Sequence, residues 1–390
     1  MLPMIFKTTV ATAIISTFAT SAFAAIDGQT VLDRLAAQLE LQGVTLDAGS
    51  VAVEGGDDVV LNDVTLKITE TDPIKIDSFI LQDVVEAPND GYIVGRMGVP
   101  NFETVTDDVK FSFGGVVVEG YFIAGPNETD PILKGSYYRR AVSGPMTVTR
   151  NGQTLFSSGE GIATISDYQP GGKVETDLAV EDLFIDFTAT GDAKTTEAVK
   201  ALGYEQVEGK LEAKGVWDLG NGDLILDPMT ISADDAADLT FRFEIGGYTP
   251  ELAAAVQEVQ KENKDNEQQM GIAMLGMMQQ LDINSASITI EDKSLTGRLI
   301  DYFGAQQGMN RESTIAFAKG MLPLGLAQLG APDFAATASA AIGQYLDNPK
   351  TLTISAAPAN PVPVAQLIAA GASNPAALIS TLALKVEANK

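Results

Sequence analysis

The segment Ile288 to Gly308, ITIEDKSLTGRLIDYFGAQQG, holds the closest gathering of reactive side chains in the chain. A serine next to a lysine and a carboxylate could serve nucleophilic or acid–base catalysis. The same side chains could instead cap and brace a helix, because the segment joins an alternating run to a run with helical spacing. The residues concerned are Asp292, Lys293, Ser294, Arg298 and Asp301.

Spacing gives these residues structural roles. Asp292 or Ser294 suits the N-cap of a helix, where a side-chain oxygen accepts a free backbone N–H. Arg298 and Asp301 are spaced for an ion pair on the wet face of that helix. We therefore favour the structural interpretation of this segment over a catalytic one.

The same segment predicts which face of the helix is buried and where the helix ends. Apolar residues at four-residue spacing form a predicted inward stripe. Gly304 and Gly308 are the expected helix stops. The stripe consists of Leu295, Leu299 and Phe303, with Ile300 and Tyr302 at its edges.

Missing residue types exclude several chemistries. The chain contains no histidine and no cysteine. This excludes Ser-His-Asp and Cys-His catalysis, the usual zinc sites and HExxH metalloproteases. Ser-x-x-Lys, Gly-x-Ser-x-Gly and the phosphate-binding GxxxxGK[ST] motif are absent as well. No cofactor is expected from these patterns.

Carboxylate chemistry stays open, because the chain has 52 acidic residues. A glycan hydrolase needs two carboxylates and usually adds aromatic side chains for the sugar rings. Trp217 is the single tryptophan, and its setting equally fits a strand residue that covers a sheet edge. Paired aspartates could bind calcium loosely but are more typical of solvated turns. These pairs are Asp57-Asp58, Asp107-Asp108 and Asp234-Asp235.

The N-terminus has the pattern of a secretory signal peptide. A lysine precedes an apolar run from Val10 to Phe18, and small residues lead to a cleavage point between Ala24 and Ala25. No later run is long and apolar enough for a membrane helix. We expect an exported, soluble protein in the periplasm, with full secretion as the alternative.

Charge restricts the partners. The chain carries 25 basic and 52 acidic residues, a formal net charge of −27. A field of this sign repels nucleic acid and anionic lipid surfaces. We expect no nucleic-acid partner and no transmembrane segment in the mature chain.

Periodicity divides the chain into three sections: a signal peptide (1–24), a β-rich section (25–248) and a mainly helical section (249–390). The β-rich section opens with one amphipathic helix that Gly43 ends, and about ten mostly antiparallel strands follow. Asn151-Gly152 and Asn221-Gly222 each predict a hairpin turn. Three polar pairs before alternating apolar residues echo one another, in LNDVTLKI, LAVEDLFIDF and INSASITI.

The third section starts with the capping pattern Thr249-Pro250-Glu251. Helical runs follow, and two short strands, KTLTISA and LALKVEAN, flank a pair of short helices near the end. The prediction is an α+β fold in which a large antiparallel sheet is closed by C-terminal helices and terminal strands. The β-rich and helical sections could also form one continuous domain.

Four methionines follow the first helical run of the third section. Met270, Met274, Met277 and Met278 could line an apolar ligand pocket, or simply fill a core. Without histidine or cysteine nearby, a metal site at these positions is not expected.

The strand rhythm of VEGGDDVVLNDVTLKI and the passage LTFRFEIGGYTPEL into helices resemble exported, β-rich envelope proteins and, loosely, the AsmA-like group. That resemblance implies a long sheet with a lipid-lined groove and assigns no residue roles. The favoured function is non-enzymatic: binding of a lipid-like ligand or an envelope partner. A structural or interaction module of the envelope is the first alternative, and a carboxylate-based glycan hydrolase is the second.

Overall fold

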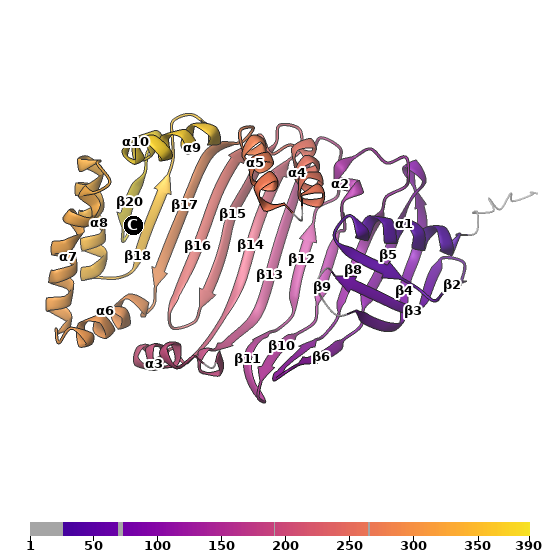
Figure 1. The fold of residues 1–390 in the computed structure, drawn as a ribbon, viewed down its shortest axis with the longest axis horizontal. Coiled ribbons are helices and arrows are strands. Elements are labelled where there is room, and N and C mark those ends of the chain that lie inside the picture. The colour runs from indigo at the N-terminus through magenta and orange to yellow at the C-terminus, as the bar shows by residue number, and fades with distance from the viewer. Residues whose placement is uncertain (1–25, 69–72, 191, 264–265) are drawn as a thin grey trace, which may run out of the picture.

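A computed structural model describes residues 26–68, 73–190, 192–263 and 266–390. The fold is α+β: one large antiparallel sheet extends through the molecule, and most helices lie in the C-terminal half. Helices cover the two ends of the sheet and follow its edges (Figure 1). The predicted fold class is confirmed.

The strands before residue 248 alternate along the chain with short turns. They are β1 (Val44–Asp47), β2 (Ser50–Glu54), β3 (Asp58–Ile68), β4 (Ile74–Ala87), β5 (Gly91–Val99), β6 (Phe102–Thr106), β7 (Val109–Phe113), β8 (Val116–Ile123), β9 (Arg140–Ser143), β10 (Met146–Arg150), β11 (Gln153–Ser158), β12 (Gly161–Ile165), β13 (Lys173–Asp186), β14 (Gln206–Asp218), β15 (Asp223–Ala233) and β16 (Ala237–Gly246). The later strands are β17 (Asp282–Asp292), β18 (Thr351–Ala356), β19 (Val362–Pro363) and β20 (Lys385–Ala388).

Three α-helices precede residue 248, and seven follow it within the described residues. The first group is α1 (Gly28–Glu40), α2 (Pro131–Lys134) and α3 (Ala193–Leu202). The second group is α4 (Pro250–Glu262), α5 (Glu267–Met278), α6 (Leu295–Gln306), α7 (Arg311–Ala327), α8 (Pro332–Asp347), α9 (Val364–Ser373) and α10 (Pro375–Thr381). Thr249 caps α4, its hydroxyl accepting from the Leu252 N–H at 3.2 Å, as the sequence predicts.

More strands form than the sequence predicts, because glycine and proline interrupt several long ones. Gly114-Gly115 separates β7 from β8, and Gly144-Pro145 separates β9 from β10. Both halves stay in the same sheet: β8 pairs with β9, and β7 pairs with β10. Proline cannot donate to a ladder and glycine permits sharp bends, so the sheet bends where these residues meet.

The echoed polar pairs mark irregular points in the sheet. Asp63 and Asp182 have left-handed backbone, with φ of 53° and 51°, and so does Asp83 at 53°. Each lies against a glycine: Gly49 and Gly159 are in connections between strands, and Gly95 is on β5, where an added Cβ would lie 2.7 Å from the Asp83 Cβ. In the third echo, the register between β16 and β17 shifts at Asn284. The similar sequence segments thus mark positions where the regular strand conformation or pairing is interrupted.

The two predicted Asn-Gly turns differ. Asn151 and Gly152 have φ of 49° and 79° and connect β10 directly to β11, as a two-residue hairpin requires. The hairpin predicted at Asn221-Gly222 also forms, because β14 and β15 pair antiparallel, but its loop is longer and runs from residue 219 to 222. Asn221 instead orders this longer loop by accepting from the Asp223 N–H at 3.0 Å.

The fully buried core lies at the N-terminal end of the sheet, under α1. Val31 and Leu35 of α1 are buried against Val59, Leu61 and Leu81 of β3 and β4. Asp27 caps the helix by accepting from the backbone of residues 29 and 30. The amphipathic helix predicted for this segment is confirmed, and it ends at Glu40, before Gly43.

The joint at β17 and α6 differs from its predicted packing. The predicted inward residue Phe303 is 49% exposed, and Ile300, expected at the edge, is buried. Gly304 does not end the helix but lies inside it, where an added Cβ would meet the Thr314 hydroxyl at 2.5 Å. Packing against α7 rotates the buried face of α6 by about one residue, because a glycine allows the closest helix approach.

Candidate functional site: an apolar sheet face

Strand pairing gathers apolar side chains into continuous rows on one face of the sheet. Residues that pair directly in antiparallel strands point to the same face. One row crosses from β13 to β20 through residues of seven neighbouring strands. It consists of Leu178, Ala213, Met229, Phe241, Ile288, Ile354 and Val386.

A second apolar row lies beside the first on the same face, two residues away along most of the strands. It follows from the same register and again reaches from β13 to β20. Its members are Val180, Leu211, Ile231, Leu239, Ile290, Leu352 and Ala388. We call the surface formed by these two rows the apolar face.

The opposite face of the same strands is polar. Thr230 and Thr240 hydrogen-bond across β15 and β16 at 3.2 Å, and Thr289 and Thr353 do so across β17 and β18 at 3.0 Å. Lys214 and Asp177 pair across β13 and β14 at 3.3 Å. The sheet therefore has one apolar face and one polar face, and only the polar face is well suited to contact with water.

Helices cover the apolar face at the ends of the sheet and leave its middle open. At the N-terminal end the first row continues into Leu81, which is fully buried. In the open part, Leu178, Ile288 and Ile354 remain 39%, 43% and 48% exposed. Figure 1 shows β13 to β17 side by side between the covered ends. A continuous patch of exposed apolar side chains is typical of a binding surface, whereas single exposed apolar residues are common on any protein.

The apolar face runs into a pocket of about 280 Å³ beneath α2 and α4. Val174 and Trp217, direct neighbours on β13 and β14, form part of its floor. The Trp217 indole N–H donates to the Tyr248 carbonyl at 2.6 Å, and the two rings lie 5.3 Å apart. Trp217 is thus fixed in place at the end of the apolar face.

Tyr137 lines the other side of this pocket and packs against Tyr168, with the two ring centroids 5.7 Å apart. The Tyr137 hydroxyl donates to the Ser166 carbonyl at 3.0 Å and accepts from the Tyr168 N–H at 3.0 Å. Burial raises the pKa of both Tyr137 and Tyr168, and the Asp130 carboxylate, hydrogen-bonded to the Tyr168 hydroxyl, raises the pKa of Tyr168 further. Two hydrogen bonds to the backbone therefore hold Tyr137 in the pocket wall.

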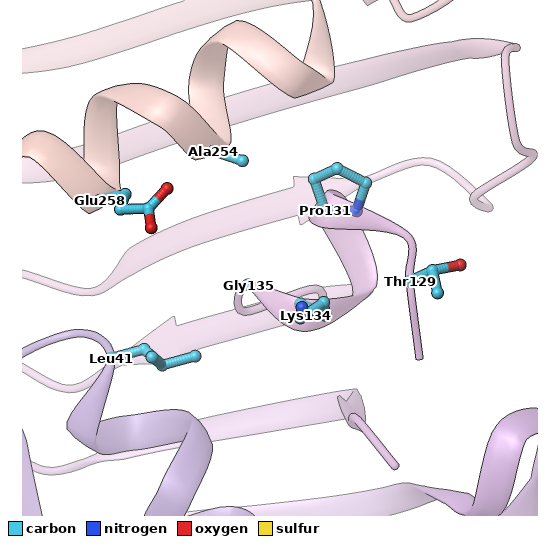
Figure 2. Close-up of a pocket in the computed structure, with 7 residues that line it drawn as sticks. All are labelled: Leu41, Thr129, Pro131, Lys134, Gly135, Ala254 and Glu258. Atoms are coloured by element: carbon cyan, nitrogen blue, oxygen red, sulfur yellow. The ribbon is translucent and has the colours of Figure 1, made fainter. Parts of the chain in front are cut away.

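A second pocket, of about 430 Å³, adjoins the first (Figure 2). Leu41 at the end of α1 and Ala254 of α4 face it from opposite sides, while Lys134 of α2 and Glu258 of α4 supply its charges. The two pockets share Pro131, Gly135 and Ala254. Together the two pockets form one cavity, lined by both apolar and polar side chains, where the covered part of the sheet meets the open part.

The four methionines share one broad face of α5 but differ in exposure. Met270, Met274 and Met277 are half-buried, whereas Met278 is 37% exposed. Helical geometry places all four on one broad face, with Met278 at its edge. They do not line either of the two pockets described above.

The reactive residues of the joint hold elements together. The Ser294 hydroxyl donates to the Asp235 carbonyl and lies 2.8 Å from the Tyr204 hydroxyl, and Asp292 accepts from the Thr296 N–H at 2.7 Å. Asp292 thus satisfies the helix start, while Ser294, at the N-cap position, makes no capping bond. No nucleophile–base pair forms among these residues.

The predicted Arg298–Asp301 ion pair is wrong. Arg298 donates to the carbonyls of Leu202 and Gly203 at 3.0 and 2.7 Å and stacks on Tyr204. Asp301 instead pairs with Arg311 of α7, and this hydrogen bonding lowers the pKa of Asp301. Longer-range partners compete with local ones because α3, α6 and α7 pack together here.

The remaining predicted residues have ordinary settings or lie outside the described range. Asp108 pairs with Arg150 at 3.1 Å, and Asp107 and Asp235 have the left-handed backbone of turns. Across the described residues, acidic side chains form no group of three or more suited to a metal. Ala24 and Ala25 lie outside the described residues. None of the helices in the described ranges is long and apolar enough to cross a bilayer.

Sequence signals for the apolar face were present in part. Alternation predicts each strand and its apolar side, but the rows exist only once the register aligns the strands. Comparison with known proteins gives one result for the second half of the chain: a family model described as an uncharacterized protein matches residues 230–389. That range includes β16 to β20 and α4 to α10. A search of the curated proteins gives no match.

Proposed function

We propose that the protein is a non-enzymatic periplasmic carrier that binds a lipid-like chain along the apolar face. The observation that carries this proposal is the pair of apolar rows left open between β13 and β18. Neighbouring strands lie about 4.8 Å apart, so a row across seven strands is roughly 29 Å long. The hydrocarbon core of a bilayer is about 30 Å thick for two leaflets. The rows are therefore long enough for a complete acyl chain.

The energetics favour an apolar ligand here. Complete burial of an isoleucine side chain stabilises by about 1.5–3 kcal/mol. Ile231, Ile288 and Ile354 are 42%, 43% and 48% exposed, so an overlying chain would gain roughly 1 kcal/mol at each. The polar face of the sheet would gain no comparable free energy from contact with an acyl chain.

Native mass spectrometry and lipid extraction of protein purified from its own host test the proposal. The variant Ile288→Asp places a charge in the middle of the apolar face, and we expect it to reduce retained lipid about tenfold. Ser287→Asp is the matched control, because Ser287 is the neighbour on the polar face and pairs with Arg242. Equal lipid content in both variants, or an empty wild-type protein, would refute the proposal.

The glycan-hydrolase alternative has less support. Glu258 is the single carboxylate among the residues that line the two adjoining pockets, whereas glycoside hydrolysis uses two carboxylates. A panel of polysaccharides and peptidoglycan fragments tests this alternative. Release of product would favour it over the carrier.

A further inference from the structure

One edge of the sheet carries three helices that are almost free of charged residues, in a chain where 20% of residues are charged. No Asp, Glu, Lys or Arg occurs from Gln268 to Leu281, which includes nearly all of α5. None occurs from Thr351 to Leu384, which includes α9 and α10. Surface helices usually carry charged or polar residues on the side that faces water, and these helices lack charged residues there.

These uncharged segments lie together in space. The Val364 N–H at the start of α9 donates to the Leu281 carbonyl just after α5, at 2.9 Å. Gly330, just past α7, lies beside Ala376 of α10. Figure 1 shows α5, α9 and α10 along the same edge of the sheet. We call the surface of α5, α9 and α10 the uncharged edge.

The uncharged edge exposes large apolar side chains. Ile272 and Leu275 of α5 are 64% and 50% exposed, and Met278 follows at 37%. The opposite side of α5 is apolar too, with half-buried methionines, so this helix has no polar face of the usual kind. Ile368 of α9 is 44% exposed. A surface helix that is apolar on both sides gains stability when a second apolar phase covers it.

We infer that the uncharged edge docks on an electrically neutral lipid surface. Exposed apolar side chains from two helices, without charges between them, match the interfacial region of a bilayer. The net charge of −27 makes an anionic surface unfavourable and leaves zwitterionic lipid as the matching phase. The helices are too short to span a bilayer, so they would lie in its interface.

The position of the edge connects docking with the apolar face. β17, which carries Ile288 and Ile290, begins at Asp282 directly after α5, and β19 beside α9 pairs with its first residues. A chain leaving the bilayer at this edge would therefore approach the apolar rows from the side, past Phe243 and Ala286, which pair directly on β16 and β17 and precede the first row. This route rests on the proposed carrier function, whereas docking itself does not.

Flotation with phosphatidylcholine vesicles tests the docking. The wild-type chain is expected to float with these vesicles and to bind phosphatidylglycerol vesicles less. Ile272→Asp should lower binding to phosphatidylcholine by about tenfold, because it places a charge in the interface. Val105→Asp is the matched control: Val105 is 66% exposed, on β6 far from this edge, and should leave binding unchanged.

The same measurements separate this inference from the proposed function. Ile288→Asp should still float, because it changes the apolar face and not the uncharged edge. A wild-type protein that carries lipid but does not float would overturn the docking alone. One that floats but carries no lipid would overturn the carrier function alone. Equal loss of flotation for Ile272→Asp and Val105→Asp would also contradict docking at this edge.

Discussion

Single residues shape the sheet through unusual backbone angles. Asp83 has a left-handed φ of 53°, a conformation that Asp tolerates better than most residues because its short polar side chain bonds locally. The Asp83 N–H donates to the Asp58 carboxylate at 3.0 Å. Gly95 lies across from it and leaves no space for a side chain. The Asp–Gly pair is thus one structural unit, although its members belong to different strands.

The first prediction concerns this pair. Gly95→Ala is expected to lower the free energy of unfolding by about 1–3 kcal/mol, because the new Cβ would overlap Asp83. Gly276→Ala is the control: Gly276 lies inside α5 with open space around it and should stabilise the protein by about 0.5–1 kcal/mol. Urea unfolding measures both. A neutral Gly95→Ala variant would show that the pair is not tightly packed.

A second residue-scale prediction concerns pH. Tyr345 is 5% exposed, its hydroxyl lies 2.7 Å from the Thr296 hydroxyl, and burial raises its pKa. In the unfolded chain a tyrosine ionises near pH 10. Stability from this group is therefore complete below about pH 10 and is lost as pH rises through the higher folded pKa. Tyr345→Phe should weaken the loss of stability above about pH 10 in urea titrations. An unchanged pH dependence would contradict this assignment.

At the scale of elements, the joint between β17 and α6 is held by residues that resemble a site. Lys293 pairs with Asp238 of β16 at 2.6 Å, and Arg298 ties α6 to the end of α3. Each contact connects elements that are distant in sequence. These contacts therefore fix the orientation of α6 relative to the sheet.

The third prediction tests the structural role of this joint. Asp292→Ala combined with Ser294→Ala removes the acceptor at the start of α6 and the hydroxyl contacts to Asp235 and Tyr204. We expect a lower melting temperature, with roughly 1–3 kcal/mol lost, and unchanged lipid retention. Thermal unfolding and lipid extraction measure the two effects. Normal stability combined with lost function would restore the catalytic interpretation.

At the scale of the whole molecule, coverage of the sheet is uneven. The side chains of β3 and β4 that face α1 are fully buried, while β13 to β16 form a single layer with half-buried residues on both faces. Local stability follows burial, because strands with few fully buried side chains open at lower cost. The single layer is thus suited to exchange a bound chain.

The fourth prediction follows from this gradient. In hydrogen–deuterium exchange, amides of β3 and β4 should exchange at least about tenfold more slowly than amides of β14 and β15. Addition of a fatty acid or phospholipid should slow exchange in β14 to β17 and leave β3 and β4 unchanged. Uniform exchange across the sheet, or protection by lipid beneath α1 only, would argue against the apolar face as the binding surface.

Elements whose structure depends mainly on residues close in sequence are predicted well. The helix over Gly28–Glu40, the Thr249 cap and the Asn151-Gly152 hairpin follow from short-range chemistry, and the structure confirms them. The apolar side of each strand is likewise predictable from alternation. By itself the sequence thus determined the fold class, the absence of His- and Cys-based chemistry, and which residues of each strand are apolar.

Tertiary structure decided what those residues do together. Leu178 and Ile354 are far apart in sequence, and only strand register places them in one row. Phe303 is exposed and Ile300 buried because α7 approaches Gly304, a contact that spacing within α6 does not contain. The open middle of the apolar face and the uncharged edge depend on where helices pack. That choice reflects the free energy of the whole assembly and is not encoded in any single element.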